Sequence, residues 1–258
     1  MAIVFDDVTY YDVHDVTFSI EDGKITGIAG SSNSGKSTII DLISGLVYPE
    51  DDSIIYDGVS TDNIGVLYQD IDDQFFYDVI IKDFYLLLKR HHIKNAEKKM
   101  TDSLKMVGLD SSYLYKSPYE ISLSEQKKVS LALVLSFNPK IIVLDEPFLG
   151  LDYKDKMRFI NLIRMMKIRY GKTVVVASRD TNIIHSLADN VVLINGGTVI
   201  GLGDKYQILT NEKLLNNCNL SIPNIIKFSN LVKDKKGVNI GYRDDINDLA
   251  KDIYRNLR

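Results

Sequence analysis

The chain has 258 residues, of which 45% are hydrophobic and 26% are charged, and its formal net charge is −4. This composition is typical of a soluble globular protein and excludes an intrinsically disordered chain. The slightly acidic balance provides no overall positive field, so we expect no nucleic-acid partner. The single cysteine, Cys218, excludes an internal disulfide framework and a cysteine-rich metal site.

Nothing in the sequence predicts a segment that enters a membrane. No apolar run approaches the ~20 residues that cross a bilayer. The first residues become acidic at Asp6 and lack a basic start, which is not typical of a signal peptide. We therefore expect a cytoplasmic chain; for any membrane process, another chain must supply the membrane part.

The N-terminal part of the chain predicts strands that lead into a glycine-rich loop. Apolar residues alternate with period two over 3–10 and over 16–20, as in half-buried strands. The apolar run 25–29 predicts a buried strand, and a Gly/Ser cluster follows at 30–35. Apolar residues at helical spacing over 39–46 then predict a helix.

The rest of the chain alternates between helical patterns and short apolar runs. Helices are expected at 79–107, 129–137, 159–166 and 183–188. Strands are expected at 64–68, 141–144 and 174–177, with a hairpin at 191–200. This alternation predicts an α/β sheet with parallel strands. From about Asp204 the chain is richer in Asn, Lys and Asp, and we expect a small helical extension there.

The glycine-rich loop matches the phosphate-binding pattern G-x-x-x-x-G-K-[ST]. Its glycines let backbone N–H groups converge on phosphate oxygens, and the helix N-terminus adds a favourable dipole. Lys36 is expected to reach the β- and γ-phosphates of ATP, and Ser37 to bind Mg²⁺ through its hydroxyl. The alternative, a flexible Gly/Ser turn, does not explain the strand before the loop and the helix after it. The residues predicted to bind the phosphates are Gly30, Ser31, Ser32, Asn33, Ser34, Gly35, Lys36, Ser37 and Thr38.

Two acidic residues follow the buried run 141–144. Asp145 is expected to hold Mg²⁺ with its hydration shell. Glu146 could polarise the attacking water as a general base. A strand that ends in two acids is common by itself. The phosphate-binding loop in the same chain is what favours the catalytic interpretation.

Together these motifs resemble the nucleotide-binding subunit of an ABC (ATP-binding cassette) transporter. Asp145-Glu146-Pro147 and the following Leu149-Gly150-Leu151-Asp152 are similar to the family's Walker B motif and D-loop. Gln69 resembles the Q-loop glutamine, which in the family senses Mg²⁺ and the membrane partner. Tyr11, or alternatively Tyr10, lies where the family places the aromatic residue that stacks on adenine; the other interpretation of Tyr11 is an ordinary strand residue.

One subgroup of the family is more similar than the rest. Residues 69–76 read Q-D-I-D-D-Q-F-F, similar to the Q-x-x-x-D-Q-x-F stretch of energy-coupling factor (ECF) and cobalt/nickel transporter ATPases. The tail is similar too, and in that group it helps the two ATPases dimerise. The resemblance implies an α/β P-loop ATPase core with an antiparallel β subdomain over 1–203. It also implies a helical subdomain at about 71–135 and a C-terminal helical extension over 204–258.

The family's L-S-G-G-Q signature is altered in this chain. Its register falls on 121–125, I-S-L-S-E, which keeps Ser122 and replaces both glycines. In the family this loop caps the γ-phosphate held by the opposite subunit, so the resemblance places Ser122 at the nucleotide, together with Asp152 of the D-loop. Side chains at Leu123 and Ser124 limit how closely the backbone approaches. Glu125 in place of Gln is a milder change.

The family's T-H-D switch motif is also altered, to Ser178-Arg179-Asp180. In the family the histidine contacts the γ-phosphate and the attacking water. Arg179 keeps hydrogen-bond donors and adds a permanent charge, but its guanidinium cannot reproduce the geometry of an imidazole. Either Arg179 takes part in catalysis, or its side chain turns into solvent.

These departures favour a particular assembly. A head-to-tail homodimer would carry both departures in each ATP site, whereas a heterodimer with a regular ATPase would carry one per site. We therefore expect a heterodimer at the cytoplasmic face of the cell membrane that hydrolyses Mg²⁺-bound ATP for ECF-type uptake of a vitamin or a Co²⁺ or Ni²⁺ ion. The implied partners are a second ABC ATPase, a transmembrane coupling subunit and a substrate-binding membrane subunit. The catalytic residues would be Glu146, Gln69 and Arg179, and the metal ligands Ser37, Gln69 and Asp145.

Two other functions stay open at this point. One is a soluble ABC ATPase of DNA repair or cofactor assembly; the net charge and the lack of a long coiled-coil insertion count against repair. The other is a degenerate subunit that binds nucleotide with little hydrolysis. Glu146 argues against that function, and Arg179 leaves it open.

Overall fold

A computed structural model describes residues 2–50, 53–71, 74–237 and 240–256. Its centre is a six-stranded sheet in the order β5-β6-β7-β3-β8-β9, parallel except for the last pair. Every residue of β3, β6 and β7 is buried, as their unbroken apolar runs predict. The strands of this sheet are β3 (Ile25–Ala29), β5 (Ile64–Leu67), β6 (Ile141–Asp145), β7 (Thr173–Ser178), β8 (Asn190–Asn195) and β9 (Thr198–Asp204).

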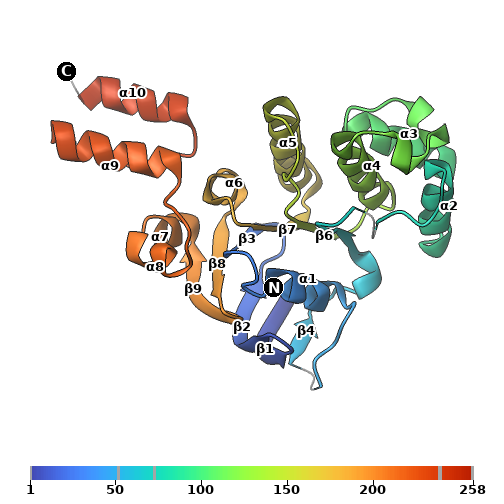
Figure 1. The fold of residues 1–258 in the computed structure, drawn as a ribbon, viewed down its shortest axis with the longest axis horizontal. Helices are drawn as coiled ribbons and strands as arrows, with labels where there is room; N and C mark the ends of the chain where they lie inside the picture. The colour runs from blue at the N-terminus through green and yellow to red at the C-terminus, as the bar shows by residue number, and fades with distance from the viewer. Residues whose placement is uncertain (1, 51–52, 72–73, 238–239, 257–258) are drawn as a thin grey trace.

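A second, antiparallel sheet has the strand order β2-β1-β4. Its strands are β1 (Ile3–Tyr10), β2 (Val13–Ile20) and β4 (Ile54–Tyr56). Helix α1 (Lys36–Ser44) lies between this sheet and the six-stranded one (Figure 1), and its apolar side chains share one core cluster with both. Strand β4 carries too little pattern to be predicted, because it has three residues and none is fully buried.

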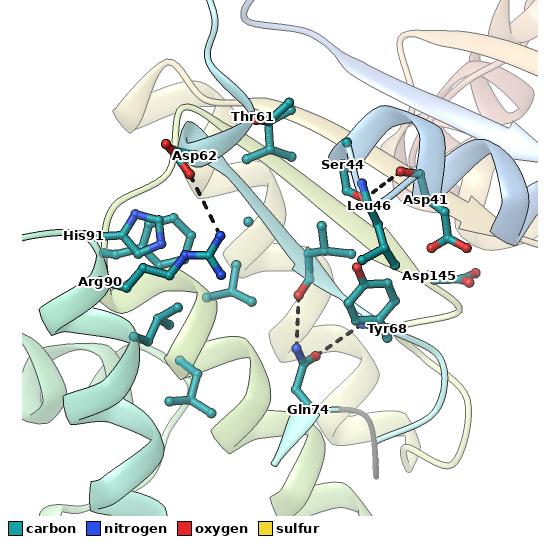
Figure 2. A pocket seen from close by; sticks show the side chains of 18 of the residues that line it. Asp41, Ser44, Leu46, Thr61, Asp62, Tyr68, Gln74, Arg90, His91 and Asp145 are labelled. Carbon is teal, nitrogen blue, oxygen red and sulfur yellow. Dashed lines mark hydrogen bonds and ion pairs between the residues drawn. The ribbon is translucent and has the colours of Figure 1, made fainter. Parts of the chain in front are cut away.

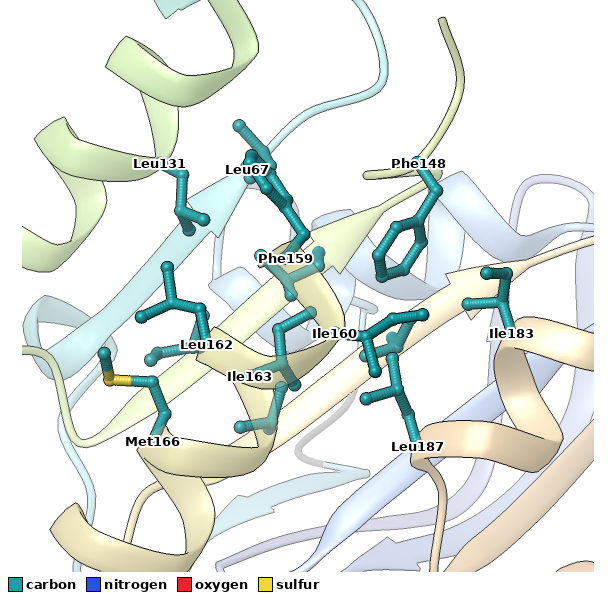
Figure 3. Close-up of a cluster of buried hydrophobic side chains, with 14 of the residues drawn as sticks. Leu67, Leu131, Phe148, Phe159, Ile160, Leu162, Ile163, Met166, Ile183 and Leu187 are labelled. Atoms are coloured by element: carbon teal, nitrogen blue, oxygen red, sulfur yellow. The ribbon is translucent and has the colours of Figure 1, made fainter. Parts of the chain in front are cut away.

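The other face of the large sheet is covered by α5 (Tyr153–Tyr170) and α6 (Thr181–Leu187). Figure 3 shows Phe159, Ile160 and Ile163 of α5 among the buried side chains of this face, close to Phe148. Helix α5 ends at Gly171, whose left-handed φ of 59° closes it as expected.

The helical subdomain contains α2 (Ile80–Arg90), α3 (Ala96–Met106) and α4 (Leu123–Ser136). The helical patterns expected over 79–107 form two helices, separated by a turn in which His92 and Asn95 have positive φ. Helix α4 begins six residues before the predicted start at 129. The reason is a capping box, in which Ser122 and Glu125 satisfy each other's backbone N–H groups.

The C-terminal region is helical, with α7 (Lys205–Leu209), α8 (Glu212–Asn217), α9 (Asn224–Lys236) and α10 (Ile246–Asn256). Helices α7 and α8 belong to the main core, to which they contribute Ile208, Leu209 and Leu215. Helices α9 and α10 lie at the opposite end of the molecule from α2 and α3 (Figure 1). In the described part of the chain, no helix is both long and apolar enough to cross a membrane.

Candidate nucleotide site

The phosphate-binding loop joins β3 to α1, as the sequence predicts. Two left-handed residues turn it, Asn33 with φ 58° and Gly35 with φ 100°. Gly35 is the N-cap of α1, and a Cβ there would lie 3.2 Å from Val13 Cγ2 in addition to the strain of its φ. A glycine is therefore required at 35, where the loop turns into the helix N-terminus.

Lys36 is the first residue of α1 and is buried. Its Nζ donates to the carbonyl oxygens of Gly30 at 3.0 Å and Ser31 at 2.7 Å. Burial lowers the pKa of Lys36, and the carboxylates of Glu146 and Asp145 oppose that shift. The ammonium group is thus held across its own loop, where a phosphate could replace the carbonyls as its partner.

A cavity of about 450 Å³ lies against this loop. Ten of its lining residues are predicted site residues: Ser32, Asn33, Ser34, Gly35, Lys36, Ser37, Thr38, Gln69, Glu146 and Arg179. Asp12 and Leu149 also line it and were missed. No local motif marks Asp12; its only signal is that it follows Tyr11 in the sequence.

The predicted metal ligands line one cavity, and two of them are in contact. Ser37 Oγ donates to Asp145 Oδ2 at 2.9 Å, and both residues, with Gln69, line an adjacent larger cavity. Burial raises the pKa of Asp145, while the Ser37 hydroxyl and the Lys36 charge lower it. The other oxygen, Asp145 Oδ1, is buried with no hydrogen-bond partner among the described residues.

This donor set fits Mg²⁺. Hydroxyl, amide and carboxylate oxygens are its usual ligands, and Mg²⁺ often keeps waters and phosphates as its other ligands. An unpartnered buried carboxylate oxygen is the group that a divalent cation would satisfy. In the described residues, no group of three or more His, Cys, Asp or Glu side chains is placed to hold a metal ion.

Glu146 is positioned by the neighbouring strand. It has a left-handed φ of 40°, and its N–H donates to the carbonyl of Ala177 at 3.0 Å. Its carboxylate accepts from Ser178 Oγ at 2.9 Å and from the N–H of Arg179 at 2.8 Å. Its carbonyl accepts from the buried Lys127 at 3.1 Å. Ser178 and Lys127 are supporting residues that the sequence analysis missed, because these contacts join distant segments.

Five predicted site residues line neither cavity: Tyr11, Gly30, Ser31, Ser122 and Asp152. Tyr11 is 89% exposed, and Ser31 supports Lys36 only through its carbonyl. Asp152 Oδ1 accepts from the N–H of Asp155 at 2.7 Å and caps α5. Ser122 caps α4 in the same way. Asp73, part of the predicted Q-x-x-x-D-Q-x-F stretch, lies outside the described residues.

The polar side chains of the segment 121–125 are all hydrogen-bonded to other residues of this chain. Glu125 Oε2 accepts from Ser122 N at 2.8 Å and from Ser122 Oγ at 2.7 Å, while Tyr113 OH donates to Oε1. These hydrogen bonds lower the pKa of Glu125 to about 2. Ser124 Oγ donates to Asp155 Oδ2 at 2.7 Å, and Lys128 pairs with the same oxygen at 2.7 Å. The replacement of the family's Gln by Glu125 is therefore a larger change than the sequence analysis expects, because it places a negative charge at the N-terminus of α4.

The larger cavity, about 940 Å³, is a groove between α1, β5 and the helical subdomain (Figure 2). Gln74 lines this groove, and its side chain donates to Val66 O at 3.3 Å and accepts from Tyr68 N at 3.2 Å. Leu46, Tyr48 and Phe76 line the groove and are largely exposed.

The fold and this site define a class: a phosphate-binding loop and two acids at the ends of parallel strands form a P-loop ATPase. A family model described as ABC transporter matches residues 13–149. The chain is 31% identical over 234 residues to "Energy-coupling factor transporter ATP-binding protein EcfA3" of Oenococcus oeni, with 85% of this chain and 81% of the relative covered. For "Energy-coupling factor transporter ATP-binding protein EcfA2" of Clostridium perfringens the identity is 30%, with 88% and 85% covered.

Solved structures agree in fold. A dimeric ATP-binding cassette in a post-hydrolysis state bound to ADP and Pi has a TM-score of 0.72 at 24% identity, covering 80% of this chain and 99% of that one. CbiO1 of Clostridium perfringens, described as part of the ABC transporter complex cbiONQ, has a TM-score of 0.70 at 24% identity, covering 88% and 98%.

The chain belongs to the ABC transporter family. It is an ATPase that binds ATP, and it serves as the ATP-driven subunit of a membrane transporter. The predicted family and fold class are thereby confirmed.

Proposed function

We propose that this chain is one of two different ATPase subunits of an ECF-type uptake transporter for a vitamin or a Co²⁺ or Ni²⁺ ion. Its relatives with energy-coupling factor names match over most of both chains. In this assembly it lies at the cytoplasmic face of the membrane, next to a transmembrane coupling subunit and a substrate-binding membrane subunit. The groove of Figure 2 is the surface that we assign to the coupling subunit, because exposed apolar side chains line it beside Gln69.

At the nucleotide, the backbone N–H groups of 30–38 and Lys36 hold the phosphates. Ser37, Asp145 and Gln69 would hold Mg²⁺, which supplies positive charge at the transferred phosphoryl group. Glu146 accepts the proton of the attacking water. The hydrogen bonds from Ser178 and from the N–H of Arg179 fix its carboxylate at the cavity.

The observation that carries the heterodimer is the capping box at 121–125. In a head-to-tail dimer this segment would face the nucleotide of the other subunit. Here the hydroxyl and the N–H of Ser122 both donate hydrogen bonds to the carboxylate of Glu125. That carboxylate would repel a phosphate. A Cβ at Gly150 would lie 2.8 Å from Leu123 Cδ2, so the Leu123 side chain also leans over the D-loop. A partner with a regular signature would complete the site that contains Lys36.

The test is purification of the tagged chain from detergent-solubilised membranes, followed by mass spectrometry and ATPase assays. We expect a second ATPase chain with an intact L-S-G-G-Q segment and a polytopic membrane protein to co-purify. The isolated chain should hydrolyse ATP at least ~10-fold more slowly than the complex. An isolated chain as active as the complex would contradict the heterodimer, and absence of any membrane protein would contradict the transporter assignment.

A further inference from the structure

The turn between β1 and β2 places a carboxylate beside the nucleotide cavity. Asp12 Oδ1 accepts a hydrogen bond from Thr38 Oγ1 at 2.7 Å, and Asp12 lines the 450 Å³ cavity with the phosphate-binding loop. Within the described residues, Oδ2 of Asp12 has no hydrogen-bond partner. One oxygen of this carboxylate is therefore left for a ligand.

This turn is fixed relative to the loop. The N–H of His14 donates to Gly197 O at 2.9 Å, and the N–H of Gly197 donates to Ser34 O at 3.0 Å. The carbonyl of Asp12 lies so close to Gly197 that a Cβ there would be 1.9 Å from it. The β8–β9 hairpin thus joins the turn to the phosphate-binding loop, and the position of Asp12 does not depend on Thr38 alone.

A carboxylate in a phosphate site requires an explanation, because it repels the ligand that the site binds. A carboxylate only accepts hydrogen bonds, and the phosphate oxygens of ATP also only accept. The hydroxyl groups of the ribose are donors. Asp12 is hydrogen-bonded to Thr38, which we assign to the phosphates, and it directly follows Tyr11, the residue that the family resemblance assigns to the base. The sugar is the part of ATP that joins the phosphates to the base.

We propose that Asp12 accepts a hydrogen bond from a ribose hydroxyl and makes the site selective for ribonucleotides. This inference rests on the proposed ATP site. Its consequence is a preference that neither the loop nor the acids at 145 and 146 can provide, because those groups contact only the phosphates and the attacking water. The repulsion between Asp12 and the phosphates is offset only when the hydroxyl is present, so a deoxyribonucleotide loses the contact and keeps the repulsion.

The test is isothermal titration of the wild-type chain, and of its Asp12→Ala and Asp12→Asn variants, with ATP, 2′-deoxy-ATP and 3′-deoxy-ATP in the presence of Mg²⁺. We expect the wild type to bind ATP about 5- to 10-fold more tightly than one of the deoxy analogues, which also identifies the hydroxyl. Asp12→Ala should abolish this difference, because it removes both the contact with the hydroxyl and the repulsion of the phosphates. Asp12→Asn should keep part of it, because its amide oxygen still accepts.

Asp15→Asn is the matched control. Asp15 is an exposed acid on the same hairpin, does not line the cavity, and makes its contacts with Thr9. It should keep the wild-type selectivity. Equal binding of ATP and both deoxy analogues by the wild type would overturn this inference alone, as would full selectivity in a folded Asp12→Ala variant. Absence of binding by all three nucleotides would overturn the proposed nucleotide site as well.

Discussion

The phosphate-binding pocket and the segment 121–125 differ in whether their polar groups have hydrogen-bond partners. In the pocket, Ser34 Oγ and Asp145 Oδ1 are buried without a hydrogen-bond partner among the described residues. Such groups cost free energy unless a ligand satisfies them. In the segment, the hydroxyl and N–H of Ser122 are already satisfied by Glu125, and Ser124 is bonded to Asp155.

The difference indicates that the two regions are adapted to different tasks. The pocket keeps polar atoms that a nucleotide and its metal would satisfy, whereas the polar side chains of the segment already have partners within this chain. We expect the phosphate-binding loop of this chain to support ATP hydrolysis well at its own site. We expect its segment 121–125 to support hydrolysis poorly at the partner's site. Five substitutions, taken from the largest expected effect to the smallest, test that comparison.

Lys36→Ala should have the largest effect. It removes the ammonium group that we place on the β- and γ-phosphates, so ATP hydrolysis at this site should fall by at least about 100-fold. Steady-state ATPase assays and nucleotide titration measure the loss. Lys140→Ala is the matched control, since Lys140 is an exposed lysine remote from the cavity. Equal activity of the two variants would refute the assignment of the pocket.

Glu146→Gln should separate hydrolysis from binding. The amide cannot take a proton from water, so single-turnover hydrolysis should fall about 100-fold. ATP affinity should change by less than about threefold, because Glu146 is assigned to the water rather than to the phosphates. A parallel loss of affinity and rate would show instead that Glu146 maintains the shape of the pocket.

Arg179→His should raise turnover at the site that contains Lys36. The N–H of residue 179 still holds Glu146, and an imidazole restores the group that the family uses at this position. We expect a gain of about 10-fold, measured in the complex with the partner's own phosphate-binding lysine replaced. An unchanged or lower rate would indicate that Arg179 has taken over the role.

Glu125→Gln should improve the segment 121–125. It removes a negative charge from the N-terminus of α4, so hydrolysis at the partner's loop should rise about fivefold in a Lys36→Ala background. Because the pKa of Glu125 is about 2, its carboxylate stays ionised across the neutral range. The gain should therefore be the same at pH 6.5 and pH 8. A gain confined to the higher pH would point to another titrating group.

Ser122→Ala should have the smallest effect on activity. Its hydroxyl is engaged in the capping box, so the expected cost is about 1 kcal/mol of unfolding free energy, seen as a small fall in Tm. Hydrolysis at the partner's loop should change by less than about twofold. A large loss of hydrolysis with an unchanged Tm would mean that Ser122 leaves its cap to contact the phosphate.

The parts of the site that could be predicted are contiguous in the sequence. Residues 30–38 form their own turn and helix start, and Asp145 and Glu146 end a strand that is recognisable by itself. The contacts that could not be predicted join distant segments: Thr38 with Asp12, Glu146 with Ser178, and Lys127 with the carbonyl of Glu146. Hydrophobic periodicity did not predict β4, because this strand has only three residues. It also did not predict where α4 begins, because a capping box sets that position.

Local pattern alone therefore determined the alternation of strands and helices, the phosphate-binding loop and the pair of acids, because each depends on neighbouring residues. Only the tertiary structure decided that α7 and α8 belong to the core, that Tyr113 and Asp155 bond to the segment 121–125, and that Asp12 lines the nucleotide cavity. These features arise when the chain brings remote residues within hydrogen-bonding or packing distance, and sequence spacing carries no record of those distances.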